Sequence, residues 1–176
     1  MRVGDVGFDC WTSVRNPTDE HIRMAEQHRK VAEMHRAAAQ ALRDAEARSC
    51  VGISEYDRDV SPFAHREDIT AVAPITGRVS SGKNSPASEK TLGARITFHE
   101  VPGLTAERLQ RIVDCHLARN AALGHDLTEM TYCPLVPNGV KAQVQQTESG
   151  HFTVEVRADD ALVAQEVWSR AAKLSH

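Results

Sequence analysis

The amino-acid sequence predicts an α+β protein in which a long N-terminal helix precedes a small β-α-β-β-α open-faced sandwich. Two patterns indicate this fold class. Residues 18–49 are rich in alanine and contain no helix-breaking residue, which favours one uninterrupted helix. From residue 93 onward, segments of alternating apolar and polar residues are interspersed with segments of helical periodicity. A small sheet that carries its helices on one face accounts for the second pattern.

The long helix has a clear start signal. Asn16-Pro17-Thr18 supplies a capping residue and a first-turn proline, and Asp19 and Glu20 favour the positive end of the helix dipole. At about 1.5 Å per residue this helix would run on the order of 45 Å, which is long for a small domain. It must cross a domain, pair with another helix or protrude. We therefore expect an N-terminal extension over residues 1–17 and a separate amphipathic helix over residues 18–50.

Residues 51–92 are expected to form a largely irregular region with one strand. Asp68–Ala73 has the composition of a strand that Pro74 would end. Residues 76–93 contain glycine, serine, lysine and proline in succession, which is typical of a loop.

One motif in that loop resembles a nucleotide-binding sequence only in its spacing. Gly77, Gly82 and Lys83 follow the G-x-x-x-x-G-K pattern of a phosphate-binding loop. Asn84, however, stands where such a loop needs a Ser or Thr hydroxyl to hold magnesium. We therefore expect a coincidence rather than a nucleotide site.

Residues 93–176 are expected to form the α+β domain itself. The expected elements, in chain order, are a strand at 95–101, a helix from Thr105 to Gly124, a hairpin of strands at 140–145 and 152–156, and a last helix capped by Asp159 or Asp160. A strand at 69–73 would add a fourth member to this sheet.

Composition excludes several function classes. The chain of 176 residues has a net charge of −3 and a pI of about 6.3, so no overall field attracts nucleic acid or an acidic membrane. No apolar run approaches the roughly 20 residues of a transmembrane helix. We therefore expect a soluble globular protein without a nucleic-acid partner. The unusual feature is the supply of metal-binding side chains, with nine His, four Cys and four Met.

The densest group of such side chains lies within twenty positions of the C-terminal half. It consists of Cys115, His116, His125, Met130 and Cys133. Thiol and thioether sulfur are soft donors and imidazole is a borderline donor, a combination that suits copper or, without the methionine, zinc. The expected loop after the 105–124 helix would bring these donors back past its end. The sequence thus predicts copper binding, storage or delivery at this cluster, with zinc as the alternative metal.

The same residues also support structural interpretations. His116 lies on the apolar stripe of its helix, where a buried histidine bonded to a carbonyl is common. Cys115 could equally be a small buried residue or half of a disulfide to Cys133 or Cys50. A minor alternative is a thiol-dependent redox enzyme in which His125 acts on Cys115 from the loop.

The cysteines leave the compartment open. Cys10, Cys50, Cys115 and Cys133 could make two disulfides by any of three connectivities in an oxidising compartment, and would be thiols or metal ligands in a reducing one. The residues after Met1 lack the apolar stretch of a signal peptide, but a removed leader leaves no trace. A periplasmic or secreted location is favoured over a cytoplasmic one.

A second pattern lies on the long helix, where His21, His28 and His35 recur every seven residues. Met24 lies between the first two, so His21, Met24 and His28 can converge as a secondary metal site. The same stripe continues with Val31, Ala38 and Leu42. Seven-residue recurrence is typical of a helix-packing seam, in which histidines make association sensitive to pH. An exposed copper-capturing face and a solvated surface are the competing interpretations.

These observations define the alternative function. In it the chain is a protein–protein interaction or oligomerisation module with structural cysteines. The helix over residues 18–50 would pair with a second copy of itself, giving a homo-oligomer, or with a partner protein.

Overall fold

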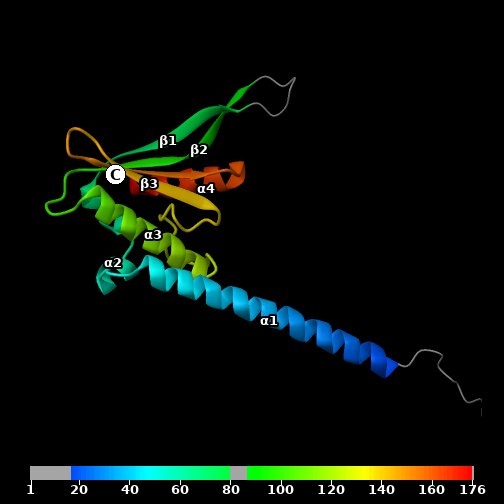
Figure 1. Ribbon diagram of the computed structural model, residues 1–176. Helices are drawn as coiled ribbons and strands as arrows, with labels where there is room; N and C mark the ends of the chain where they lie inside the picture. Colours follow the sequence, from blue (N-terminus) through cyan, green and yellow to red (C-terminus); the bar gives the residue numbers. More distant parts are fainter. Residues whose placement is uncertain (1–16, 80–86, 176) are drawn as a thin grey trace, which may run out of the picture. The chain divides into compact units, whose positions relative to one another are not determined.

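The computed structural model describes residues 17–79 and 87–175 (Figure 1). The chain divides into two compact units, Met1–Ala39 and Gln40–His176, which are described separately. The boundary lies inside the first helix, so the described part of the first unit is helical throughout. The expected extension over residues 1–17 lies outside the described residues apart from Pro17, and so does Cys10.

The expected long helix is confirmed as α1 (Pro17–Ser49), which begins one residue before the expected range of 18–50. Asp19 and Glu20 lie in its first turn and Arg48 in its last, so the charges match the helix dipole at both ends. After it come the short helix α2 (Glu55–Asp59) and the single turns η1 (Pro62–Ala64) and η2 (Arg66–Asp68). None of the helices in the described ranges is both long and apolar enough to cross a membrane.

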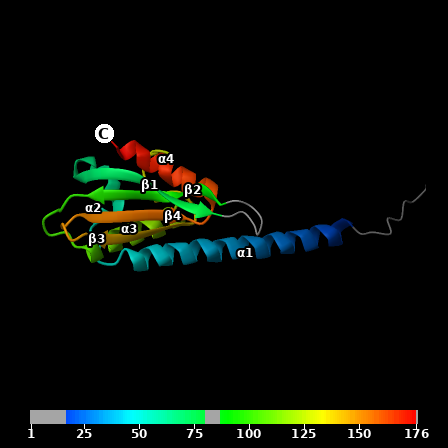
Figure 2. The ribbon, with the colours of Figure 1, turned by 90° about the horizontal axis from the view of Figure 1, so that it is seen from above.

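The second unit contains a four-stranded antiparallel sheet, and the α+β class is therefore confirmed. Its strands are β1 (Ile69–Val79), β2 (Ser88–Phe98), β3 (Val140–Gln146) and β4 (Phe152–Ala158), in the spatial order β1-β2-β4-β3 (Figure 2). Since β4 is antiparallel to both of its neighbours, β2 and β3 run parallel, and α3 (Ala106–Ala122) connects them. The helix α4 (Ala161–Ala171) and the turn η3 (Ala172–Leu174) follow β4. The order is thus β-β-α-β-β-α, with the 69–73 segment as part of the added strand.

One face of the sheet carries the hydrophobic core, and α3 and α4 lie on that same face (Figure 1). The buried strand residues alternate along the two central strands, as an open-faced sheet requires. They include Ala94, Ile96 and Phe98 of β2 and Phe152, Val154 and Val156 of β4. The helices contribute Leu109, Val113, Val167 and Ala171 to the same cluster. The opposite face is polar, with Arg95 bonded to Glu155 at 2.6 Å.

The expectation that Pro74 ends its strand is wrong. β1 continues through Pro74 to Val79, and Pro74 is paired in register with Ala94 of β2. β1 is an edge strand and has only β2 as a neighbour. Because one side of an edge strand makes no ladder hydrogen bonds, a residue without an N–H is tolerated there.

The expected loop over residues 76–93 is instead largely a β-hairpin. Thr76 to Val79 pair with Thr91 to Ser88, beyond the part of β2 that pairs with β4. Gly77, the first glycine of the phosphate-loop spacing, lies inside β1, and the next described element is a strand rather than the helix that such a loop needs. Gly82, Lys83 and Asn84 lie outside the described residues. Glycine and serine in these positions misled the composition argument, because strand pairing supplies the order that local preference lacks.

Candidate functional site

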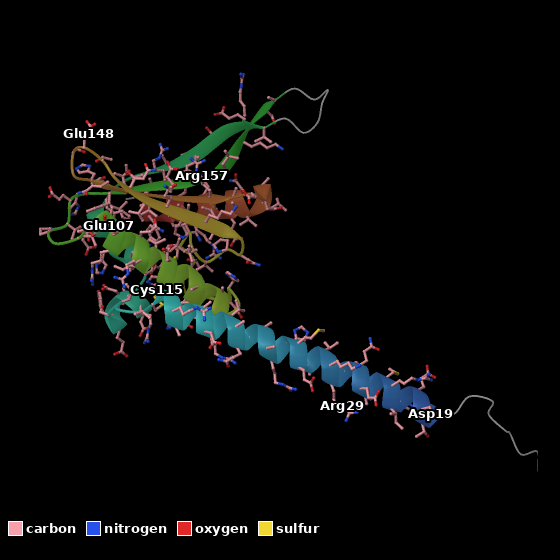
Figure 3. All side chains as sticks on the ribbon, viewed as in Figure 1. Asp19, Arg29, Glu107, Cys115, Glu148 and Arg157 are labelled. Carbon is pink, nitrogen blue, oxygen red and sulfur yellow. A yellow bond between two sulfur atoms is a disulfide. The ribbon has the colours of Figure 1, made fainter. Side chains whose placement is uncertain are left out.

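The sulfur atom of Cys115 is bonded to that of Cys50 across 65 positions of the chain. Cys50 directly follows α1, and Cys115 lies fully buried in the middle of α3 (Figure 3). The bond therefore joins the end of α1 to α3 within the second unit. Of the alternatives that the sequence left open for Cys115, the structure has the disulfide, with Cys50 as the partner. A bonded sulfur offers no thiolate to a metal or a substrate.

Two ion pairs reinforce this junction. Arg119 of α3 lies 3.1 Å from Glu46 of α1 and 3.1 Å from Asp59 at the end of α2. Asp59 is also 3.1 Å from Arg58, and the two arginines hold the pKa of this carboxyl below its usual range. The last turn of α1 is thus held on α3 by one covalent bond and by charge pairs beside it.

His116 is a buried structural residue. Its side chain is 2% exposed, and its Nε2–H donates to the carbonyl oxygen of Asp57 at 2.9 Å. Burial lowers the pKa of His116, and the hydrogen bonds to the backbone of Asp57 and Val60 only partly oppose this. The imidazole is therefore neutral near pH 7 and ties α2 to α3.

The remaining members of the predicted cluster have structural contacts of their own. His125 follows the end of α3 with a positive φ of 59°, and its Nδ1–H donates to the carbonyl oxygen of Val136 at 2.8 Å. Met130 is partly buried against the hydrophobic core. Cys133 is 1% exposed and accepts a hydrogen bond from Ser61 at 3.5 Å. Burial raises the pKa of Cys133, so its thiol is protonated and lacks the features of a reactive cysteine.

The structure does not bring these side chains together as ligands. Across residues 17–79 and 87–175, no group of three or more His, Cys, Asp or Glu side chains could hold a metal ion. Cys115 is bonded to Cys50, and His116 and His125 donate to different carbonyl groups. Copper binding at residues 115–133 therefore stays a prediction, and no contact among the described residues supports it.

The second unit also has an apolar pocket that no sequence pattern indicated. Its volume is about 240 Å³, and its floor is formed by buried Phe98, Leu109 and Ile112. At its rim the hydroxyl of Tyr56 lies 3.1 Å from Nε2 of His65. This arrangement can hold a small apolar group beside a hydrogen-bonding edge. Its residues come from α2, η1, η2, β2 and α3 and from the segments between them, so a linear pattern does not show it.

The described part of the first unit presents a continuous uncharged surface on α1, which we call the uncharged stripe. The stripe contains His21, Met24, Ala25, Gln27, His28, Val31, Ala32, Met34, His35, Ala38 and Ala39. At about 100° per residue these positions cover roughly half of the helix circumference. All of them are exposed except Ala32 and Ala39, which are half-buried, and Met24 and Met34 have exposed fractions of 49% and 64%.

Every charged residue between His21 and Ala39 lies outside the stripe. The charged residues on the other half of the helix are Arg23, Glu26, Arg29, Lys30, Glu33 and Arg36 (Figure 3 labels Arg29). The apolar Ile22, which is 51% exposed, also lies on that half. The histidine repeat lies on the uncharged face, but the separation of charged from uncharged residues around the helix defines that face more clearly. Over residues 21–39 the helix therefore has one charged and one uncharged face.

Comparisons with known proteins provide no further guide to the function. Neither the protein-family models nor the curated proteins nor the solved structures contain a match to this chain.

Proposed function

We propose that the chain is a protein–protein interaction module that dimerises through α1. In the proposed dimer the uncharged stripe packs against the same stripe of a second copy, with the two helices parallel and in register. The observation that carries the proposal is that all charged residues between His21 and Ala39 lie on one half of the helix, while the other half is uncharged and largely exposed.

The spacing along the stripe supports pairing between helices. His21, His28 and His35 alternate with Met24, Val31 and Ala38 at steps of three and four residues, which is the spacing of the a and d positions of a coiled coil. Such a spacing keeps one seam of a helix facing its neighbour over several turns. A helix that only faced water would have no reason to keep this period.

The residues that flank the seam favour a second copy as the neighbour. Ala25, Ala32 and Ala39 recur on one side of it, and small side chains allow two helices to approach closely. On the other side lie Gln27 and Met34, which are also neutral. Two copies of the stripe therefore meet without placing like charges opposite each other.

The junction at the end of α1 gives the helix a structural role in the second unit. The Cys50–Cys115 disulfide and the Arg119–Glu46 ion pair fix the last turn of α1 to α3. The last turns of α1 therefore belong to the folded α+β unit. Pairing of two α1 helices would join two such units. The copper proposal for residues 115–133 has no comparable support.

Sedimentation velocity over a range of protein concentrations tests the proposal. At pH 7.5 we expect a monomer–dimer equilibrium in which the share of dimer rises with the protein concentration. Val31→Lys should weaken the dimer by about 2 kcal/mol or more, roughly thirtyfold, because a charge enters the interface.

Ala37→Lys is the matched control. Ala37 is an exposed residue of the same helix outside the stripe, so this variant should dimerise like the wild type. An Ala38→Cys variant tests the direction. Position 38 lies near one end of the stripe, so it faces its own copy in a parallel, in-register pair, where it should form an intermolecular disulfide, but not in an antiparallel pair that aligns the two stripes. A concentration-independent monomer at pH 7.5 would show that the proposal is wrong.

A further inference from the structure

We infer that pairing of two α1 helices creates a copper site formed by Met24 and His28 of both copies. This inference rests on the proposed dimer. The sequence predicted a secondary metal site at His21, Met24 and His28 of one helix. The inference places the site between two chains instead.

A single copy of α1 provides two suitable donors close together. Met24 and His28 are four residues apart, so they lie on the same face about one turn from each other. Both belong to the exposed part of the uncharged stripe. Side chains of a helix lean toward its N-terminus, so His28 leans toward Met24. One imidazole and one thioether are too few to hold a metal firmly.

The second copy completes the set. In a parallel, in-register pair each residue lies opposite its own copy, and the axes of packed helices are about 8–10 Å apart. The Met24 and His28 layers are separated by about 6 Å along the axis, at about 1.5 Å per residue. Two imidazoles and two thioethers therefore surround one region of the seam.

This donor set selects copper. Thioether sulfur is a soft ligand that favours Cu(I), and imidazole binds copper readily, whereas zinc sites use thiolate, imidazole and carboxylate donors. His35 has no such methionine: the residue four positions before it is Val31, whereas Met24 stands four positions before His28. We therefore expect copper to bind at His28 and not at His35.

The metal would also remove a cost of pairing. An imidazole that is buried in a helix interface without a hydrogen-bond partner is unfavourable. His28 is exposed in a single copy, so its ring would lose its contacts with water when it enters the interface. Coordination to copper satisfies the ring nitrogen, and copper should therefore strengthen the dimer.

The test is a Cu(I) titration of the full chain at pH 7.5 under anaerobic conditions with ascorbate, against a chromophoric Cu(I) chelator. A Cys10→Ser background removes the cysteine that lies outside the described residues. We expect one tightly bound copper per two chains and at least a tenfold stronger dimer by sedimentation, with no such effect of Zn²⁺ or Mg²⁺. Met24→Leu and His28→Gln should abolish both effects, whereas the controls Ile22→Leu and Ala37→Gln, at exposed positions of the same helix outside the stripe, should retain them.

The outcomes separate this inference from the proposed dimer. A dimer that binds no copper, or binds it equally well in the Met24 and His28 variants, would overturn the copper site and leave the dimer intact. A chain that stays monomeric with and without Cu(I) would overturn both. A dimer that forms without added metal and tightens with Cu(I), at one copper per two chains, would support both.

Discussion

The side chain of Gln110 in α3 takes the place of a neighbouring strand for Val144 in β3. Its Oε1 accepts the N–H of Val144 at 2.7 Å, and its Nε2 donates to the carbonyl oxygen of Ala142 at 3.3 Å. β3 is an edge strand of the sheet, and its outward backbone groups would otherwise be open to another strand. One glutamine therefore covers part of an edge that would favour strand-to-strand aggregation.

Gln110→Ala should expose this edge. We expect a loss of about 1–2 kcal/mol in the free energy of unfolding, because a backbone donor and an acceptor lose their partner. The amide of Val144 should exchange with solvent faster, which NMR hydrogen exchange measures. Gln110→Glu retains the acceptor and should protect that amide better than alanine does. Equal protection of Val144 in wild type and Gln110→Ala would contradict this role.

The Cys50–Cys115 disulfide should contribute strongly to stability. It closes a loop over 65 positions, and the chain-entropy estimate for such a loop is about 4 kcal/mol. Urea unfolding of the wild type with and without reductant, and of the Cys50→Ser, Cys115→Ser double variant, measures this contribution. The double variant should lose about that amount and no longer respond to reductant. Cys133→Ala is the control for thiol effects, and it should still respond to reductant as the wild type does.

Gly93 should not tolerate a side chain. Its φ is 149°, and a Cβ atom there would collide with the carbonyl oxygen of Val156 in the adjacent strand β4. Gly93→Ala is expected to cost about 3 kcal/mol or more, because the β2–β4 pairing would have to separate locally. Gly139→Ala is the comparison, since Gly139 also has a positive φ, 78°, but no atom within 4 Å of the added Cβ. It should lose only about 1–2 kcal/mol by thermal or urea unfolding.

His116 should make stability depend on pH. Burial lowers its pKa in the folded chain, while the unfolded chain keeps the ordinary value of 6.5. As the pH falls below that value, the unfolded chain takes up a proton more readily than the folded one, so the free energy of unfolding decreases until the folded-state pKa is reached. Above about pH 7.5 this contribution is complete and constant. His116→Gln, which can still donate to Asp57, should flatten the decline between pH 7.5 and 5 in urea titrations, and an unchanged slope would count against this assignment.

The sequence predicted secondary structure correctly where an element is determined by contacts between residues close together in the chain. Thr105 accepts the N–H of Arg108 at the start of α3, and Asp160 accepts those of Leu162 and Val163 at the start of α4. Both caps were among the expected ones because capping involves residues two or three positions apart. Residues 76–79 were mistaken for loop because their order comes from pairing with residues 88–91.

The candidate site divides in the same way. The repeat of His21, His28 and His35 on α1 is a property of one helix, so the sequence determined it together with the α+β class and the helix boundaries. Tertiary structure decided which contacts residues 115–133 make. It bonded Cys115 to Cys50, and it gave His116 a carbonyl partner in α2 and His125 one in the loop after α3. The sequence shows which side chains in this segment could act as ligands. The packing of α1, α2 and the loop after α3 determines which atom each of these side chains faces. A short-range pattern cannot contain that information, because the contacts that decide it join residues up to 72 positions apart.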